Sequence, residues 1–207
     1  MNLFCKCAAL AVVVAMPPMG ASADGHEGAS FFLTSIGLGD GANLGGLAGA
    51  DAHCTALAET AGITGSTWAA YLSDDSTNAR DRIGSGPWVN HNGVTVATDV
   101  ANLHDAAANA LSKENSVSES GAIVNGRGDK PNMHDILTGS DAAGMSTGAN
   151  CANWTSNGEG AATVGHHDRT GGGADPTSWV AAHPSRGCSQ SDLQGTGGNG
   201  LFYCFAK

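Results

Sequence analysis

Positive charge is scarce in this chain. Nine Lys and Arg residues stand against 19 Asp and Glu residues, so the net charge is −10 when histidine is neutral. An acidic surface repels phosphate and sulfate polymers and attracts divalent cations. The composition therefore argues against nucleic acid as a partner, disfavours heparin, and favours divalent metal ions.

Two sequence signatures of enzymes are also missing. The chain contains no Gly-Lys-Ser/Thr phosphate loop and no His-Glu-x-x-His segment, each of which sets catalytic or phosphate-binding groups at a fixed spacing. Its cysteines are better explained as disulfide partners than as nucleophiles. We therefore expect a protein that is not an enzyme.

Long apolar runs are confined to the N-terminus. The stretch Ala8–Met16 follows Lys6 and precedes the small residues Ala21–Ala23, and it is too short to cross about 30 Å of hydrocarbon. This pattern predicts a signal peptide over residues 1–23, cleaved before Asp24. Loss of Lys6 would leave eight basic against 19 acidic side chains, a net charge of −11. We expect a secreted or periplasmic protein without a membrane span.

Aromatic residues make up only 5% of the chain, whereas glycine occurs 31 times. Many turns and few large core side chains are expected, so covalent closure would help the fold. Two of the six cysteines lie in the predicted signal peptide. The other four, in an exported protein, are expected to form disulfides, and they allow three pairings; they are Cys54, Cys151, Cys188 and Cys204.

The remaining pattern predicts one α+β domain over residues 31–207, preceded by a short flexible segment, 24–30. Its sheet is expected to be mostly antiparallel. Two longer helices are predicted over 50–61 and 100–111, with a short one over 77–83. Strands are predicted over 31–36, 67–73, 135–139, 151–156 and 201–205, with a hairpin over 88–97 that turns at Asn92-Gly93. Residues 157–178 are rich in glycine and predicted to form a long loop.

Several segments taken together resemble one family. They are Gly45–Cys54, Ala61–Ser73, Leu137–Gly144, Asn150–Trp154 and Leu201–Phe205. This succession resembles the endostatin-like branch of the C-type-lectin-like fold, which includes the C-terminal fragment of collagen XVIII and related secreted bacterial lectin-like domains. The resemblance implies a single C-type-lectin-like domain with two nested disulfides, Cys54–Cys204 and Cys151–Cys188. It also implies recognition of carbohydrate or of an extracellular protein.

The chain departs from that family where known ligands bind. Its arginines are scattered, so heparin binding does not carry over. Only His26 lies near the N-terminus, which puts the family's N-terminal zinc site in doubt. The Glu-Pro-Asn and Trp-Asn-Asp runs of calcium-dependent sugar binders are absent, and Asn153–Asn157 is only a loose echo of the second.

We expect the ligand surface in the glycine-rich region. Indole rings stack on sugars where they are exposed, although the low aromatic content favours their use in the core. The candidate ligand-binding residues are Asn153, Trp154, His166, His167, Asp168 and Trp179.

Metal binding is the main alternative. Imidazole and carboxylate groups in His166-His167-Asp168 suit zinc, with His183 or Asp175 as further ligands. A mature N-terminus Asp24-Gly25-His26 would suit copper or nickel. Oxygen donors that suit calcium, or equally serve as turn and cap residues, occur at Asp74 with Asp75 and at Asp141 with Asn150 and Asn153.

The segment Arg127-Gly128-Asp129 matches an adhesion tripeptide, but three-residue matches are common by chance. The sequence therefore predicts a secreted, non-enzymatic binding module. A metal-binding protein or metal-dependent enzyme built on His166-His167-Asp168 is the first alternative, and a structural or adhesion component of the envelope is the second.

Overall fold

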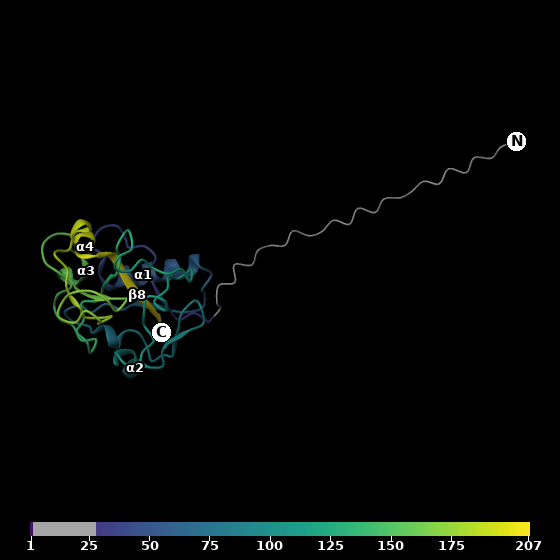
Figure 1. Cartoon of the computed structure of the whole chain (residues 1–207), viewed down its shortest axis with the longest axis horizontal. Coiled ribbons are helices and arrows are strands. Elements are labelled where there is room, and N and C mark those ends of the chain that lie inside the picture. Colours follow the sequence, from purple (N-terminus) through teal and green to yellow (C-terminus); the bar gives the residue numbers. More distant parts are fainter. Residues whose placement is uncertain (2–27) are drawn as a thin grey trace.

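The computed structural model describes Met1 and residues 28–207. Residues 2–27 are drawn as a grey trace in Figure 1. The predicted signal peptide and the candidate metal ligands Asp24 and His26 therefore lie outside the described residues, and they remain predictions.

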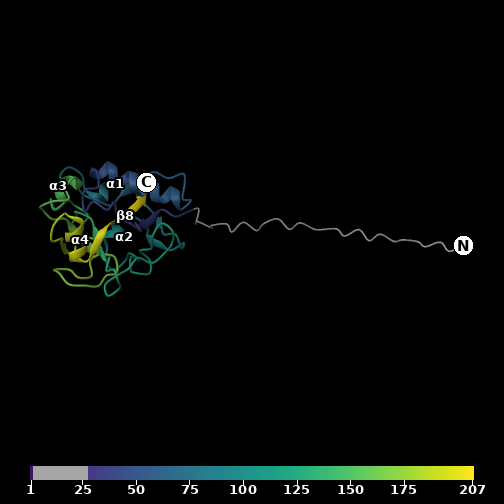
Figure 2. The ribbon, with the colours of Figure 1, turned by 90° about the horizontal axis from the view of Figure 1, so that it is seen from above.

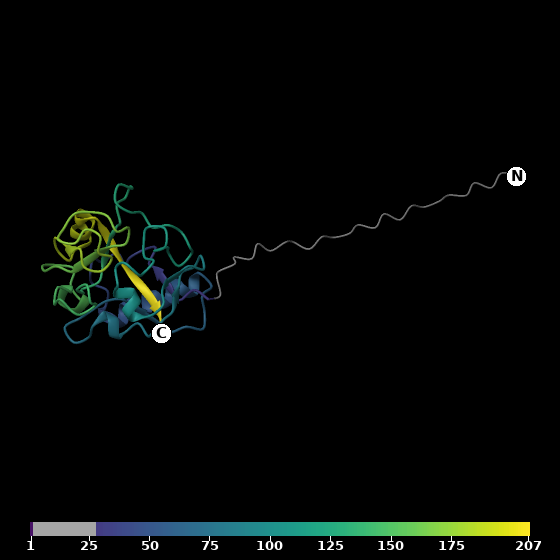
Figure 3. The same cartoon turned by 60° about the horizontal axis from the view of Figure 1, so that its bottom comes forward.

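A six-stranded sheet organises the domain around its last strand, β8 (Gly198–Ala206). Figure 1 shows β8 in the middle of the fold, and Figure 3 shows it running from α4 to the C-terminus. The strand order is β1-β8-β5-β6-β7, and β2 also pairs with β8. All pairings are antiparallel except β5 with β8. The other strands are β1 (Phe31–Leu33), β2 (Trp68–Ala70), β5 (Asp135–Leu137), β6 (Thr163–His166) and β7 (His183–Pro184).

The apolar run Leu201–Phe205 is continuous because β8 is covered on both faces. Successive side chains of a strand point to opposite faces. Phe202 and Cys204 enter one core cluster, whereas Leu201, Tyr203 and Phe205 enter the other. An uninterrupted apolar strand is the pattern expected for a sheet buried on both sides.

Helix α1 (Gly46–Thr60) covers the first of these clusters with a stripe formed by Ala50, Cys54 and Ala58. Figure 2 shows α1 beside β8. The helix begins four residues before the predicted start. The remaining elements are a 3₁₀ turn η1 (Ala79–Asp81), the hairpin β3 (Trp88–Val89) with β4 (Thr95–Ala97), and the helices α2 (Val100–His104), α3 (Cys151–Trp154) and α4 (Gln190–Thr196).

Both disulfides form in the nested arrangement. Cys54–Cys204 joins α1 to β8 across 150 residues, and Cys151–Cys188 closes a loop of 37 residues inside it. The predicted α+β class with a mostly antiparallel sheet and these two bridges is confirmed. The described residues contain four α-helices, whereas two longer helices and a short one are predicted, and the short one is the 3₁₀ turn η1. The two helices that the sequence does not predict are α3, which lies in a predicted strand, and α4, in which only Leu193 is buried.

The strand predicted over residues 151–156 is wrong. Cys151 to Trp154 all have positive φ, between 50° and 64°, and the amides of Trp154 and Thr155 donate to the carbonyls of Asn150 and Cys151. This is one turn of left-handed helix, which costs roughly 1–2 kcal/mol per non-glycine residue. The Asn150 side chain caps the turn, and the Cys151 bridge and the buried Trp154 ring hold it.

The loop predicted over residues 157–178 also differs, since β6 lies within it. Val164 is the strand's only large apolar residue, so the sequence carries little strand signal there. Among the described residues, no helix combines the length and apolarity that a membrane crossing requires.

Candidate metal centre

Four polar side chains meet at one end of the central sheet. His134 directly precedes β5, Asp135 begins it, His166 ends β6, and His183 begins β7. Asp135 lies directly opposite His166 in the antiparallel pair, so their side chains share one face. His183 lies opposite Val164, two residues before His166, and thus projects from the same face. Strand register brings Asp135, His166 and His183 together, and His134 joins them from the residue before β5.

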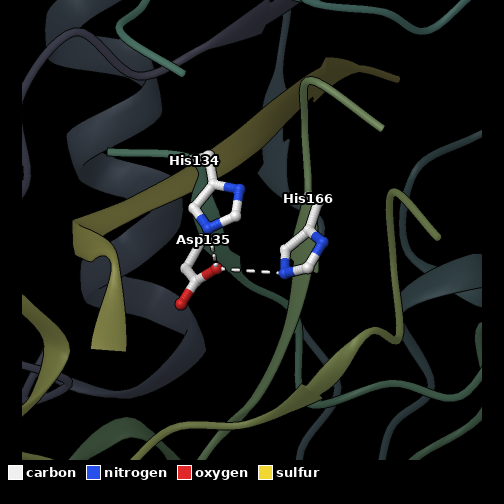
Figure 4. Close-up of side chains that lie close together, drawn as sticks. All are labelled: His134, Asp135 and His166. Atoms are coloured by element: carbon white, nitrogen blue, oxygen red, sulfur yellow. Dashed lines mark ion pairs between the residues drawn. The ribbon is translucent and has the colours of Figure 1, made fainter. Parts of the chain in front are cut away.

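The carboxylate oxygen Oδ1 of Asp135 is the centre of this group. It lies 3.1 Å from His134 Nε2, 3.2 Å from His166 Nε2 and 3.6 Å from His183 Nε2. The Nε2 atoms of His166 and His183 are 3.0 Å apart. Figure 4 shows the imidazole rings of His134 and His166 turned toward Asp135. The ligand atoms of His134, Asp135 and His166 all lie within 4.8 Å of one another, as in a metal-binding group.

The opposite nitrogen of each ring faces an oxygen acceptor. His134 Nδ1 lies 3.3 Å from Asp168 Oδ1, His166 Nδ1 lies 2.8 Å from the Pro176 carbonyl, and His183 Nδ1 lies 3.0 Å from the Pro184 carbonyl. A proton on each Nδ1 would satisfy these acceptors, and a neutral ring in that tautomer turns an Nε2 lone pair inward. Histidine ligands of metals are oriented by such outer hydrogen bonds.

The Asp135 carboxylate is buried, at 3% exposure, and neither oxygen has a hydrogen-bond partner among the described residues. The nearby Nε2 atoms of His134, His166 and His183 lie at ion-pair distance from its Oδ1. A buried charge without a partner costs several kcal/mol. When the three rings are neutral, the site is therefore rich in inward electron pairs, and only a protonated ring or a bound cation would balance the carboxylate.

Glycine at two positions lets the chain pass close to the rings. Gly171 has φ of 146°, and a Cβ there would lie 2.5 Å from His166 Cε1. Gly197 has φ of 139°, and its Cβ would lie 3.1 Å from His134 Nε2. A larger residue at either position would push on the histidines.

Electrostatics separates the three predicted residues of the His166-His167-Asp168 segment. Burial alone would lower the pKa of His166, but the Asp135 carboxylate and the Pro176 carbonyl outweigh it and raise that pKa. Burial lowers the pKa of His167. Burial alone would raise the pKa of Asp168, but hydrogen bonds from His134 and from the amides of Arg127 and Thr170 hold it well below its usual range.

The predicted segment thus divides by role. His166 belongs to the central group, whereas Asp168 accepts from the outer nitrogen of His134. His167 points elsewhere, with Nε2 3.1 Å from the Asn125 carbonyl. Of the further ligands considered, His183 joins the group and Asp175 instead accepts a hydrogen bond from Thr177.

The other predicted site residues lie apart from this group. Trp154 and Trp179 are 0% and 2% exposed, and Trp154 Nε1 donates to the Ser73 carbonyl, so neither ring offers an open stacking face. The burial follows from the scarcity of other large side chains to fill the two cores.

The oxygen-donor residues serve turns and caps. Asn150 and Asn153 donate to the two carboxylate oxygens of Asp75 at 2.8 and 3.1 Å. Asp141 accepts from the amides of Ala143 and Met145, and Asp74 accepts from Ser76.

His134 and Asp135 were missed as site residues from sequence. Asp135 was assigned to a short strand, where a charged residue on the buried face is an anomaly. A His-Asp pair at the start of an apolar strand was therefore an available signal. What sequence did not show is that β6 pairs beside β5.

One further signal bears on catalysis. Gly144–Gly148 has the Gly-x-Ser-x-Gly pattern, which the expectation of a non-enzymatic protein did not take into account. A nucleophile elbow requires a strand-turn-helix setting. Here Ser146 lies in an isolated bridge with Ser140, and its hydroxyl accepts from the Gly148 amide. Among the described hydrogen bonds, none joins Ser146 to a histidine.

Comparison with known proteins adds no assignment. No protein-family model matches the chain, and its sequence matches none of the curated proteins at a significant level.

Proposed function

We propose that this domain binds one divalent transition-metal ion, zinc by preference, through His134, Asp135, His166 and His183. The observation that carries the proposal is the buried Asp135 carboxylate, for which no hydrogen bond is found among the described residues, surrounded by three Nε2 atoms at 3.1–3.6 Å from its Oδ1. A cation would satisfy the carboxylate and the lone pairs together. Tetrahedral zinc with bonds of about 2.0–2.1 Å spaces its ligands about 3.3 Å apart, and four of the six ligand pairs lie 3.0–3.6 Å apart.

The donor set favours zinc over calcium. Calcium takes six to eight oxygen ligands, whereas this group offers three imidazole nitrogens and a carboxylate. Imidazole suits zinc, copper and nickel alike, and copper generally binds such sites more tightly. Filling four positions with protein ligands is the mark of a structural zinc site rather than of a catalytic one that keeps a position open.

A metal-free network of charged histidines is the competing explanation. It would place imidazolium protons between the rings and Asp135. Yet two Nε2 atoms 3.0 Å apart cannot both carry protons, and the two carboxylates of Asp135 and Asp168 cannot balance three imidazolium charges. A single dication resolves both conflicts.

The test is a competition titration of zinc against a chromogenic chelator, using protein stripped of metal. We expect one zinc per chain, with a binding free energy of about 10 kcal/mol or more and thus a Kd of tens of nanomolar or tighter. H166A should abolish tight binding. H53Q is the matched control, because His53 lies on α1 and contacts the Ile36 carbonyl. Unchanged affinity in H166A, or no binding to the wild type, would refute the proposal.

We also propose that the domain has the C-type-lectin-like fold and is exported. Two features support this. The disulfides are nested, and the first strand pairs with the last, with Phe32 opposite Cys204. Disulfides also suit an oxidising compartment. N-terminal sequencing of the mature protein should begin at Asp24. Recognition of carbohydrate or an extracellular protein stays a prediction, which a glycan array run with zinc and then with chelator would test.

A further inference from the structure

We infer that metal occupancy anchors the exposed loop at residues 125–130, with Asp168 as the positioning residue between the metal centre and the loop. The inference rests on the proposed metal binding and adds a consequence for a surface that lies outside the ligand set. This loop carries Arg127-Gly128-Asp129, and both Arg127 and Gly128 are exposed.

Asp168 contacts both the proposed ligand His134 and the loop at Arg127. Its Oδ1 accepts from His134 Nδ1 at 3.3 Å, while its Oδ2 accepts from the Arg127 amide at 2.6 Å. The Asp168 side chain is itself buried, at 4% exposure. One carboxylate therefore bridges a proposed metal ligand and the backbone of the loop. Such carboxylate–histidine pairs orient metal ligands.

A second contact runs parallel to the first. The His167 amide donates to the His134 carbonyl at 3.2 Å, and His167 Nε2 lies 3.1 Å from the Asn125 carbonyl. The two residues that follow ligand His166 thus hold the loop at Asn125 and Arg127. Gly126, between them, passes so close that a Cβ would lie 2.7 Å from Asp168 Oδ2.

The remaining loop contacts are local and lie nearer the surface. Asp129 accepts from Lys113 Nζ at 2.5 Å and from the Gly126 amide at 2.8 Å, and Asn125 Nδ2 donates to the Pro131 carbonyl. Because the Asp129 carboxylate is occupied within the domain, the exposed charges of this loop are the cations Arg127 and Lys130. This arrangement does not present Asp129 as a free acid.

The physical link is local stability. Metal bound to the folded site stabilises it against any opening that separates the ligands. Releasing the Arg127 amide requires its hydrogen bond to Asp168 Oδ2 to break, and the position of that carboxylate is set by the contact of its Oδ1 with His134. With metal bound, His134 and His166 are held in place, so their neighbours Asp168 and His167 hold the loop more firmly.

The rate of limited trypsin cleavage after Arg127 measures how firmly the loop is held, because cleavage there requires the loop to extend. The adjacent Lys130 is followed by Pro131, which blocks a competing cut. We expect saturating zinc to slow cleavage at Arg127–Gly128 by roughly tenfold relative to metal-free protein, since cleavage follows the open population. Cleavage after Arg80, whose guanidinium contacts the Ala143 carbonyl, is the internal control and should change little.

The D168N variant tests the route. It should still bind zinc, with affinity weaker by roughly 10–100-fold, while zinc protects Arg127 much less than in the wild type. D81N, at an exposed aspartate in η1, is the matched control and should behave as the wild type. Near-UV circular dichroism checks that each variant is folded.

The outcomes separate the two proposals. If zinc binds the wild type but leaves cleavage at Arg127 unchanged, the loop inference is wrong and metal binding stands. If D168N binds zinc and keeps full protection, the route through Asp168 is wrong. If the chelator competition detects no zinc binding, both proposals fail.

Discussion

Replacing Asp135 with asparagine should have opposite effects on the metal-free and zinc-loaded protein. Asparagine has nearly the shape of aspartate, so the pairing of β5 with β6 and β8 should persist. In metal-free protein the change removes a buried charge that has no hydrogen-bond partner, and we expect D135N to be more stable than the wild type. With zinc present, the variant loses its anionic ligand and most of the stabilisation by metal.

The two magnitudes can be worked out separately. A buried polar group left without a partner costs about 1–3 kcal/mol, and more when charged, so metal-free D135N should gain at least about 1 kcal/mol. Zinc at 100 times its Kd stabilises the wild type by about 2.7 kcal/mol. For a domain of this size that raises Tm by roughly 5–10 °C. In D135N the zinc-induced rise should shrink to a degree or two, about what weak residual binding supplies.

Thermal unfolding followed by circular dichroism, with and without zinc, measures both effects. D81N provides a control for removing one exposed negative charge. The sign in metal-free protein is decisive, because a network of charged histidines paired to Asp135 predicts that D135N destabilises the fold. Destabilisation of metal-free D135N, or an unchanged response to zinc, would refute the reasoning.

Three further predictions concern the scaffold. Replacing both Cys54 and Cys204 with alanine should lower the free energy of unfolding by about 5 kcal/mol, and replacing both Cys151 and Cys188 should lower it by about 4 kcal/mol. These values follow from the loss of chain entropy on closing loops of 150 and 37 residues. Equal urea midpoints for the wild type and either variant would contradict this prediction. In the same assay, A152G should raise the free energy of unfolding by about 0.5–1 kcal/mol. Ala152 is exposed and has φ of 54°, and glycine relieves left-handed strain at some entropic cost. A destabilised variant would show that the turn is unstrained. Burial lowers the pKa of His104, whose Nε2 lies 2.6 Å from the Tyr71 hydroxyl. Its contribution to stability is therefore complete above the ordinary histidine pKa of about 6.5 and is lost as pH falls through that value toward the lowered one. The wild type should lose more stability than H104Q between pH 7.5 and 5.5, and equal losses would refute the assignment.

Local patterns predicted the elements whose signal is strong over several residues. The Ala50, Cys54 and Ala58 stripe marked α1, and the run Leu201–Phe205 marked β8. The turn pair Asn92-Gly93 marked the hairpin, whose strands flank it. Each of these three elements is predicted by a periodic apolar pattern, an apolar run or a turn pair, and such signals depend only on residues that are close in sequence.

Elements with a weak local signal were missed or misassigned. Asn150–Trp154 looks extended in sequence, yet the Asn150 cap and the Cys151–Cys188 bridge hold it in a left-handed turn. β6 falls within the loop predicted over residues 157–178, and Gly165 interrupts its short strand pattern. A Cβ at that glycine would lie 1.9 Å from the Trp179 carbonyl, so the close approach of a distant segment requires it.

The sequence by itself determined the acidic charge, the four cysteines available for bridging, the α+β class and a histidine-rich stretch suited to metal. Tertiary structure alone decided which histidines meet. Ligand geometry depends on strand register, and register depends on pairings between β5, β6, β7 and β8 that span more than 60 residues of sequence. His166 at the end of β6 faces the Asp135 carboxylate, whereas the adjacent His167 contacts the Asn125 carbonyl. His134 and His183, far apart in the chain, lie beside that same carboxylate.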